Sequence, residues 1–318
     1  MTETMRNPGI PLDLGWACET NHINLSAVER RATTLTKRRT VKKEWQAAWL
    51  LKAIACTDLT TLAGDDTPGN VRRLCAKARQ PVRQDLLAEV GLPSLNVAAV
   101  CVYHTMLPTA VEALGNSTDI LVAAVSTGFP AAQNPPELRV KEIEMSVAAG
   151  AKEIDIVISR SKVLRGEWES LYEEVQGFRR ACGDAHLKTI LATGELGNLR
   201  NVRMASLVCM MAGADFIKTS TGKEKVNATL PFGLVMTRAI RDYQDKTGYK
   251  VGFKPAGGIR TAKDALNWLI LMKDELGDEW LEPNLFRLGA SALIEDIERQ
   301  LSHFVTGRYA ARHHIPMG

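Results

Sequence analysis

The sequence predicts an α/β fold, a single (β/α)8 TIM barrel with an N-terminal extension. From Glu44 onward, short runs rich in β-branched and apolar residues alternate with longer amphipathic segments. Eight strand runs, each followed by a helical segment and spaced roughly thirty residues apart, match the count and the roughly 250-residue length of such a barrel. The alternative is an open doubly wound sheet, but no G-x-G-x-x-G motif follows the first strand run.

Residues 1–45 are expected to form the extension, partly helical or flexible. They precede a barrel domain over 46–318 that ends in a short tail at about 305–318. The extension holds eight Lys/Arg and five Asp/Glu, a net charge of +3, which leaves only +1 of the chain's +4 for the body. Its basic 30–43 segment is a candidate contact for nucleic acid or a partner protein. The alternative, a solvated helical face leading into Trp45 and Trp49, is favoured about two to one.

The barrel elements follow from residue 44 in chain order. The expected strands are 53–57, 96–103, 120–126, 153–159, 187–193, 216–220, 251–254 and 285–288. The expected helices include 136–149, 166–181, 199–211, 230–243 and 261–276, and the long segment 72–90 is expected to hold two. Pro136 and Pro231 suit helix starts, whereas Gly150, Gly213 and Gly248 suit helix ends.

Composition places the chain among globular proteins that function away from a membrane. Apolar residues make up 45% and charged residues 24% of the chain, and the longest apolar runs are far too short to span a bilayer. The first eight residues lack the features of a signal peptide. Six scattered cysteines without a C-x-x-C pair favour a reducing compartment. We therefore expect a cytoplasmic protein, and the basic segment also allows a nuclear location.

Asp155 is the first candidate for chemistry. In the strand run 153–158, three isoleucines share one face and Asp155 shares the other with Val157. The isoleucine face suits contact with helices, so Asp155 is expected to point into the barrel. A carboxylate there is costly unless it is paired or catalytic. A catalytic role is favoured over a buried ion pair, and both need a cation nearby.

Two lysines supply that cation. Lys218 and Lys254 lie toward the C-terminal ends of two adjacent expected strands, at the barrel face where active sites form. Two ammonium groups placed close together favour the neutral form of one, which activates a lysine for Schiff-base chemistry. For a single lysine, a side chain that reaches to solvent is the more frequent alternative. The combination with Asp155 makes catalysis the better interpretation.

Three glycine-containing turns follow the last three strands, at Thr219–Lys223, Gly257–Thr261 and Leu288–Ser291. Helix N-termini with exposed amides bind anions, and barrels commonly bind phosphate after strands 7 and 8. Each turn alone is weak evidence, because most glycine turns are ordinary loops. Together they predict a phosphate site.

The runs F-I-K-T-S-T-G-K (216–223), V-G-F-K-P-A-G-G-I-R-T (251–261) and F-R-L-G-A-S (286–291) resemble the deoxyribose-phosphate aldolase family. D-L-T-T-L (58–62) and A-A-V-C-V-Y (98–103) fit the same pattern, so the resemblance covers residues 50 to 300. With its extension, the chain is similar to the long eukaryotic form. The resemblance implies a class I, metal-independent aldolase that interconverts 2-deoxy-D-ribose 5-phosphate with glyceraldehyde 3-phosphate and acetaldehyde in carbohydrate catabolism.

By matching positions, the resemblance implies the role of each site residue. Lys218 would form the imine, Lys254 would depress its pKa, and Asp155 with a bound water would transfer protons. The supporting pocket residues would be Asp58, Cys101 and Thr221, although a small buried hydrophobe is an equal alternative for Cys101. The phosphate would be held by Gly222, Lys223, Gly257, Gly258, Gly289 and Ser291. The imine on Lys218 would replace any metal or organic cofactor.

Two positions depart from the family pattern. Ala292 stands where bacterial relatives carry a second serine, so one phosphate hydrogen bond is expected to be either lost or replaced. Tyr309 lies nine residues before the end, whereas bacterial tails can end in a tyrosine that assists proton transfer. The alternatives are another lysine-dependent barrel enzyme, such as a transaldolase, and a binding role for the extension. The expected partners are a sugar phosphate and further copies of the chain, as a homodimer or homotetramer.

Overall fold

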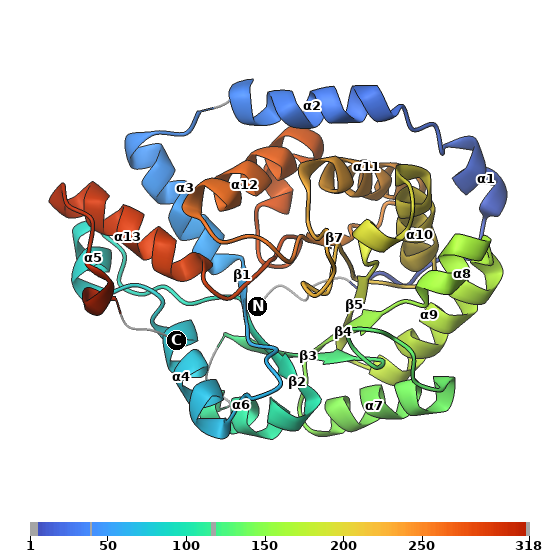
Figure 1. Cartoon of the computed structure of the whole chain (residues 1–318), viewed down its shortest axis with the longest axis horizontal. Helices are drawn as coiled ribbons and strands as arrows, with labels where there is room; N and C mark the ends of the chain where they lie inside the picture. Colours follow the sequence, from blue (N-terminus) through green and yellow to red (C-terminus); the bar gives the residue numbers. More distant parts are fainter. Residues whose placement is uncertain (1–5, 39, 116–118, 316–318) are drawn as a thin grey trace.

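The computed structural model describes residues 6–38, 40–115 and 119–315, and it confirms the predicted (β/α)8 barrel (Figure 1). Eight parallel strands form one sheet in the order β7-β6-β5-β4-β3-β2-β1-β8. Bridges from Phe253 to Phe286 and from Ala256 to Gly289 link the β7 and β8 segments and close the sheet. The strands are β1 (Thr57–Thr60), β2 (Ala99–Tyr103), β3 (Leu121–Ser126), β4 (Glu153–Val157), β5 (His186–Ile190), β6 (Phe216–Lys218), β7 (Gly252–Lys254) and β8 (Leu288–Ala290).

Helices surround the barrel and cover its outer face (Figure 1). They are α1 (Leu14–Glu19), α2 (Leu25–Arg38), α3 (Lys43–Ala55), α4 (Pro68–Arg79), α5 (Gln84–Glu89), α6 (Leu107–Leu114), α7 (Pro136–Ala148), α8 (Arg160–Arg165), α9 (Trp168–Cys182), α10 (Leu199–Met211), α11 (Leu230–Thr247), α12 (Ala262–Leu276) and α13 (Leu293–Thr306). The prediction of two helices within 72–90 is confirmed by α4 and α5. Within the described ranges, no helix is long and apolar enough to cross a membrane.

Two predicted strands were misplaced. The apolar run 53–57 belongs mainly to α3, whose Ala53 and Ile54 are fully buried, and β1 begins only at Thr57. A short apolar run has no clear period, so a buried helix end resembles a strand. The eighth strand lies at Leu288–Ala290 rather than 285–288, because it pairs with β1 in the register Thr57–Leu288.

The predicted alternation in β4 is confirmed. Ile154, Ile156 and Ile158 lie in the core shared with the helices, whereas Val157 packs with Ile190 in a separate cluster. Side chains alternate along a strand, so Asp155 lies on the Val157 side. The barrel interior near this strand therefore holds a fully buried carboxylate.

The N-terminal extension packs against the barrel, and α2 crosses α11 and α12 (Figure 1). Asn7 is buried below the start of β6. Its side-chain amide donates to the carbonyls of Met210 and Ala214 at 2.7 and 2.9 Å. The side-chain oxygen of Asn7, Oδ1, accepts a hydrogen bond of 3.0 Å from the hydroxyl of Tyr243. The extension thus supports the wall that carries β6.

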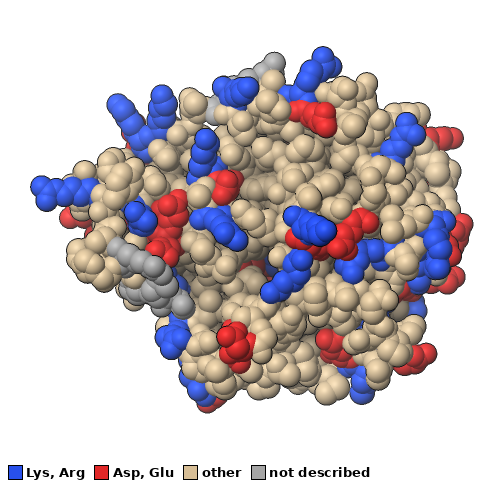
Figure 2. Space-filling model, in the orientation of Figure 1, with Lys and Arg blue, Asp and Glu red and all other residues tan. Residues whose placement is uncertain are grey.

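Part of the basic 30–43 segment packs against the barrel through α2. Arg31 forms ion pairs with Asp274 at 2.8 Å and Glu275 at 3.2 Å, and Val28 and Leu35 are buried. Position 39 of the run lies outside the described residues. On the face shown in Figure 2, basic and acidic side chains are interspersed, including along the edge formed by α2.

Candidate active site

The middle of β4 and the C-terminal ends of β6 and β7 bring the three predicted catalytic residues together inside the barrel. Lys218 and Lys254 are register partners on adjacent strands. The Nζ atom of Lys218 donates to Oδ2 of Asp155 at 2.7 Å, and Nζ of Lys254 donates to the same oxygen at 2.8 Å. Asp155 and Lys254 are fully buried, whereas Lys218 keeps 3% of its surface exposed. The pairing of an interior carboxylate with two lysines is what the strand parity predicted.

The two lysines differ in their electrostatic surroundings. Burial lowers the pKa of Lys218, and the charge of Lys254 lowers it further, against the opposing effect of Asp155. Burial would also lower the pKa of Lys254, but Asp155 and Asp58 raise it above its ordinary value. Burial would raise the pKa of Asp155, yet Lys188 and the two lysines hold it well below its usual range. Lys218 is therefore the amine that loses its proton most easily.

A layer of ion pairs lies beneath these residues, and its members Glu153, Lys188 and Arg287 were missed by sequence reasoning. Asp58 belongs to this layer. Its Oδ2 atom forms an ion pair of 2.5 Å with Nζ of Lys254, and its Oδ1 atom forms one of 2.6 Å with Nη1 of Arg287. Arg287 also pairs with Glu153 at 2.9 Å, and Lys188 pairs with Glu153 as well. All the side chains of this layer are at most 2% exposed.

The charges of this interior cluster balance only if one lysine is neutral. Among the described residues, the connected carboxylates are Asp58, Glu153 and Asp155, and the connected lysines and arginine are Lys188, Lys218, Lys254 and Arg287, with the imidazole of His186 counted as neutral 3.8 Å from Glu153. Three anions against four cations leave one excess positive charge in a buried site, which is costly. Burial and the charge of Lys254 lower the pKa of Lys218, whereas the neighbouring carboxylates raise the pKa of each of the other three cations. The cluster as a whole thus favours a neutral Lys218.

Strand parity carried a signal for the missed residues. Glu153 has the same parity as Asp155 in β4, and Lys188 lies between Leu187 and Thr189 within the expected strand run 187–193. Arg287 likewise lies between Phe286 and Leu288. A charged residue within an apolar strand run indicates an interior position, but parity does not show at which depth in the barrel it lies.

Two supporting residues lie deeper than expected. Asp58 was expected to line the substrate pocket, but it is fully buried in the ion-pair layer, where Lys188, Lys254 and Arg287 overcome the effect of burial and lower its pKa to about 2. Cys101 is fully buried beside Ala123 and Val125, and burial raises the pKa of its thiol. A small buried hydrophobe therefore describes Cys101 better than a reactive thiol does.

A cavity of about 340 Å³ opens above Lys218, with walls built from the three predicted glycine turns. The cavity is lined by Thr221, Gly222, Lys223, Gly257, Gly258, Gly289 and Ser291, which are the predicted pocket and phosphate residues of these turns. It is also lined by Thr60, Thr61, Leu62, Ala63, Ala256, Ile259, Arg260 and Ala290. The backbone amides and the basic side chains in this set suit a bound anion.

The glycines shape the cavity through their backbone. Gly222, Gly257 and Gly258 have φ values of +87°, +84° and +86°, which L side chains rarely adopt. A Cβ added at Gly257 would also lie 2.7 Å from the side chain of Asn227. Lys223 extends across the mouth, where its Nζ donates to the carbonyl of Leu62 at 3.0 Å.

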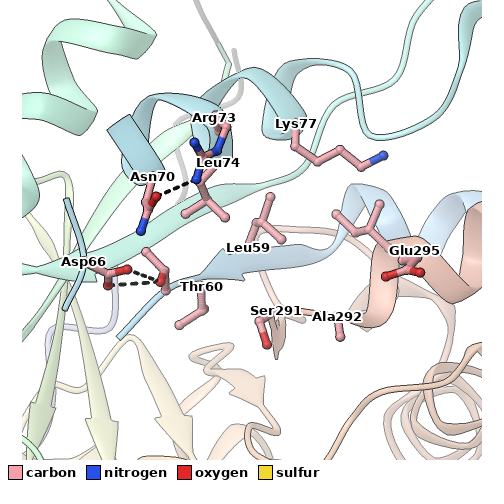
Figure 3. Close-up of a pocket in the computed structure, with 12 residues that line it drawn as sticks. Leu59, Thr60, Asp66, Asn70, Arg73, Leu74, Lys77, Ser291, Ala292 and Glu295 are labelled. Carbon is pink, nitrogen blue, oxygen red and sulfur yellow. Dashed lines mark hydrogen bonds between the residues drawn. The ribbon is translucent and has the colours of Figure 1, made fainter. Parts of the chain in front are cut away.

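A second cavity of about 330 Å³ lies between β1, α4 and the start of α13 (Figure 3). It shares Thr60, Thr61 and Ser291 with the first cavity and is also lined by Ala292 and Glu295. Ala292 is the N-cap of α13 and supplies no side-chain hydrogen bond there. Ala292 thus contributes only a methyl group to the lining of this cavity, where a second serine would contribute a hydroxyl group.

The described part of the C-terminal tail lies at the far end of α13. Tyr309 is 56% exposed and stacks on His303 with ring centroids 4.4 Å apart. His303 is eleven residues beyond the N-cap Ala292, roughly 16 Å along the helix. Residues 316–318 lie outside the described residues.

The fold and the site together define a class I aldolase, a lyase that cleaves a carbon–carbon bond through a lysine imine. A buried amine of lowered pKa, a carboxylate and a second ammonium meet at the C-terminal end of the barrel strands. The described residues contain no group of three or more His, Cys, Asp or Glu placed to hold a metal ion.

Comparison with known proteins identifies the family. The chain belongs to the DeoC/LacD family of aldolases, whose family model matches residues 52–279. It is 61% identical to the deoxyribose-phosphate aldolase of Bos taurus over 312 residues, which cover 97% of this chain and 98% of that protein.

Solved structures agree on the fold. A putative deoxyribose-phosphate aldolase from Toxoplasma gondii superposes with a TM-score of 0.70 at 19% identity, covering 84% of this chain and 98% of the other. The tetrameric deoxyribose phosphate aldolase of Aeropyrum pernix has a TM-score of 0.57 at 22% identity, covering 82% and 97%. At these identities the superpositions support the fold alone.

Proposed function

We propose that this chain catalyses the reversible cleavage of 2-deoxy-D-ribose 5-phosphate to D-glyceraldehyde 3-phosphate and acetaldehyde. The observation that carries the proposal is a lysine of lowered pKa, Lys218, at the floor of a cavity lined by glycine turns and a further lysine. The name of the Bos taurus relative, matched over nearly its whole length, supports the substrate. The reaction would serve the breakdown of deoxyribose phosphate derived from deoxynucleosides.

Catalysis begins with Lys218 as the nucleophile. Its neutral amine attacks C1 of the open-chain sugar, and loss of water from the carbinolamine gives an iminium ion. The iminium accepts the electron pair of the C2–C3 bond as that bond breaks, while the C3 hydroxyl loses its proton. Glyceraldehyde 3-phosphate leaves, and an enamine of acetaldehyde remains on Lys218. Protonation at C2 and hydrolysis of the resulting imine then release acetaldehyde.

Asp155 and Lys254 are proposed to manage the protons and the charge of these steps. The Nζ atom of Lys254 lies 2.8 Å from Oδ2 of Asp155. The same oxygen accepts a hydrogen bond of 2.7 Å from Nζ of Lys218, the reacting nitrogen. Asp155, with a bound water, would take up the proton released when the amine adds to C1 and pass it to the carbinolamine hydroxyl, and it would later take the proton of the C3 hydroxyl and return it to C2. Lys254 remains an ammonium because Asp58 and Asp155 raise its pKa, and its charge disfavours a proton on Lys218.

The phosphate is proposed to bind at the glycine turns. Lys223 and the hydroxyl of Ser291 line the cavity together with the backbone around Gly222, Gly258 and Gly289. Anchoring the phosphate fixes the distance from C5 to C1, so that the aldehyde meets Lys218. The covalent imine supplies the electron sink, so the proposed reaction uses no metal or organic cofactor.

We also propose the surroundings in which the enzyme works. Its six cysteines are free, and five of them are buried, which suits a reducing cytoplasm. A homodimer or homotetramer is the proposed assembly, checked by light scattering. Nuclear location and contact with nucleic acid or protein through residues 30–43 would rest on exposed cations such as Arg30 and Lys37. Loss of polyanion binding on changing these two residues to Gln would support that contact.

Borohydride trapping tests the proposed reaction. The protein is incubated with 2-deoxy-D-ribose 5-phosphate, reduced, digested and mapped by mass spectrometry. We expect a single reduced adduct on Lys218, and none after Lys218→Arg, which keeps a cation but cannot act as the nucleophile. An adduct on another lysine, or none in the unmodified protein, would refute the mechanism. Trapping with other sugar phosphates but not this one would favour a different lysine-dependent aldolase or a transaldolase.

A further inference from the structure

The loop between β6 and α11 contains a carboxylate bound to its own backbone. Oε1 of Glu224 accepts a hydrogen bond from the amide of Thr221 at 2.9 Å. Its Oε2 accepts from the amides of Thr221 and Gly222, both at 3.1 Å. The two amides that Glu224 occupies belong to residues that line the cavity above Lys218.

Such a pair of amides is an anion site in its own right. Consecutive N–H groups at a glycine of positive φ form a concave surface that binds carboxylate or phosphate oxygens. The Gly222 backbone also lies against the next turn, since a Cβ added there would be 3.8 Å from Cα of Gly257. The side-chain amide of Asn227 donates to the carbonyl of Glu224 at 2.9 Å and keeps the loop compact. Glu224 therefore occupies the backbone amides of Thr221 and Gly222, which lie beside the 257–261 turn that is proposed to bind phosphate.

We propose that Glu224 competes with the substrate phosphate for the amides of Thr221 and Gly222 and so sets the affinity for phosphorylated sugars. The inference rests on the proposed function, in which Gly222 contacts the phosphate. One amide hydrogen cannot serve both anions well, and two anions on one pair of amides repel each other. Glu224 is only partly buried, so its side chain can turn to solvent when the phosphate arrives.

This competition affects binding of the phosphate end and leaves the chemistry at Lys218 unchanged. A sugar without a phosphate does not need the two amides, so Glu224 can stay in place while that sugar reacts. The predicted signature is a change in KM that depends on the phosphate and spares kcat.

Glu224→Gln tests the proposal, because it removes the charge and keeps the size of the side chain. We expect KM for 2-deoxy-D-ribose 5-phosphate to fall about tenfold, with kcat unchanged and with no change in KM for unphosphorylated 2-deoxy-D-ribose. Glu295→Gln is the matched control. It removes a carboxylate from the neighbouring rim (Figure 3), and among the described contacts Glu295 makes no hydrogen bond to these amides.

Three results would overturn the proposal. An unchanged KM would show that Glu224 does not compete, and a raised KM would show that it braces the loop for binding. An equal fall in KM for Glu295→Gln would assign the effect to charge at a distance. Calorimetry with inorganic phosphate separates this inference from the proposed function. If the sugar is not a substrate, tighter phosphate binding by Glu224→Gln still supports the competition, and equal binding refutes it.

Discussion

Replacing Lys254 with Met removes one cation from the interior cluster and should shift the pH at which Lys218 becomes reactive. The ammonium groups of Lys218 and Lys254 lie 2.7 and 2.8 Å from the same oxygen of Asp155, so they are at most about 5.5 Å apart. At an effective dielectric constant of about 20, two like charges at that distance repel by about 3 kcal/mol. Loss of Lys254 removes this repulsion and therefore raises the pKa of Lys218, which the charge of Lys254 lowers in the intact cluster.

The direction of the expected change in rate depends on which protonation state of Lys218 reacts. Lys218 attacks as a neutral amine, so a higher pKa leaves less of the reactive form near pH 7. We expect the rate at neutral pH to fall about a hundredfold and to recover in part as pH is raised. The assay is the pH profile of kcat/KM for 2-deoxy-D-ribose 5-phosphate, with circular dichroism to verify the fold.

Lys223→Met is the matched control for the loss of a lysine at this site. Lys223 lines the cavity and donates to Leu62, and among the described contacts it makes no ion pair with the interior cluster. It should raise KM for the phosphorylated sugar without moving the midpoint of the pH profile. A Lys254→Met protein of normal rate, or one with a lower rate but an unshifted midpoint, would refute the electrostatic role of Lys254.

Three further predictions concern stability and the tail. Asn7→Ala should lower the free energy of unfolding, measured in urea, by about 2 kcal/mol, because it leaves the buried hydroxyl of Tyr243 without its partner, whereas Asn284→Ala at an exposed position should change it little. The folded pKa of Asp58, about 2, lies below its ordinary 3.8, so Asp58 stabilises the fold above pH 4 and loses this effect as pH falls toward 2. Urea unfolding between pH 7 and 3 should show that loss, with a smaller pH dependence in Asp58→Asn; an equal dependence would contradict the assignment. Tyr309→Phe should keep kcat within about twofold, and a large loss would place the tail in proton transfer.

Much of the barrel was predictable because its signals are local. The eight apolar runs, the isoleucine face of β4 and the glycine turns each arise within a few residues of the chain. Parity alone placed Asp155 inside, and the C-terminal ends of adjacent parallel strands brought Lys218 and Lys254 together. The resemblance supplied the substrate, which no local pattern could name.

The misplaced strands show where local signals fail. The mainly apolar run 53–57 fits either a helix or a strand, and its burial as the end of α3 decided between the two. The eighth strand was displaced because its pairing with β1 sets its register, and pairing partners are far apart in the chain.

By itself, the sequence determined the class of fold, the face on which Asp155 and the two lysines lie, and the order of the glycine turns. Only the tertiary structure decided how the charges pair. Asp58 and Arg287 meet across 229 residues, and Glu224 reaches back to the amides of its own turn. Alternation shows which face a residue occupies, but distance and depth depend on the closed barrel. For that reason the charge balance that favours a neutral Lys218 became visible only in three dimensions.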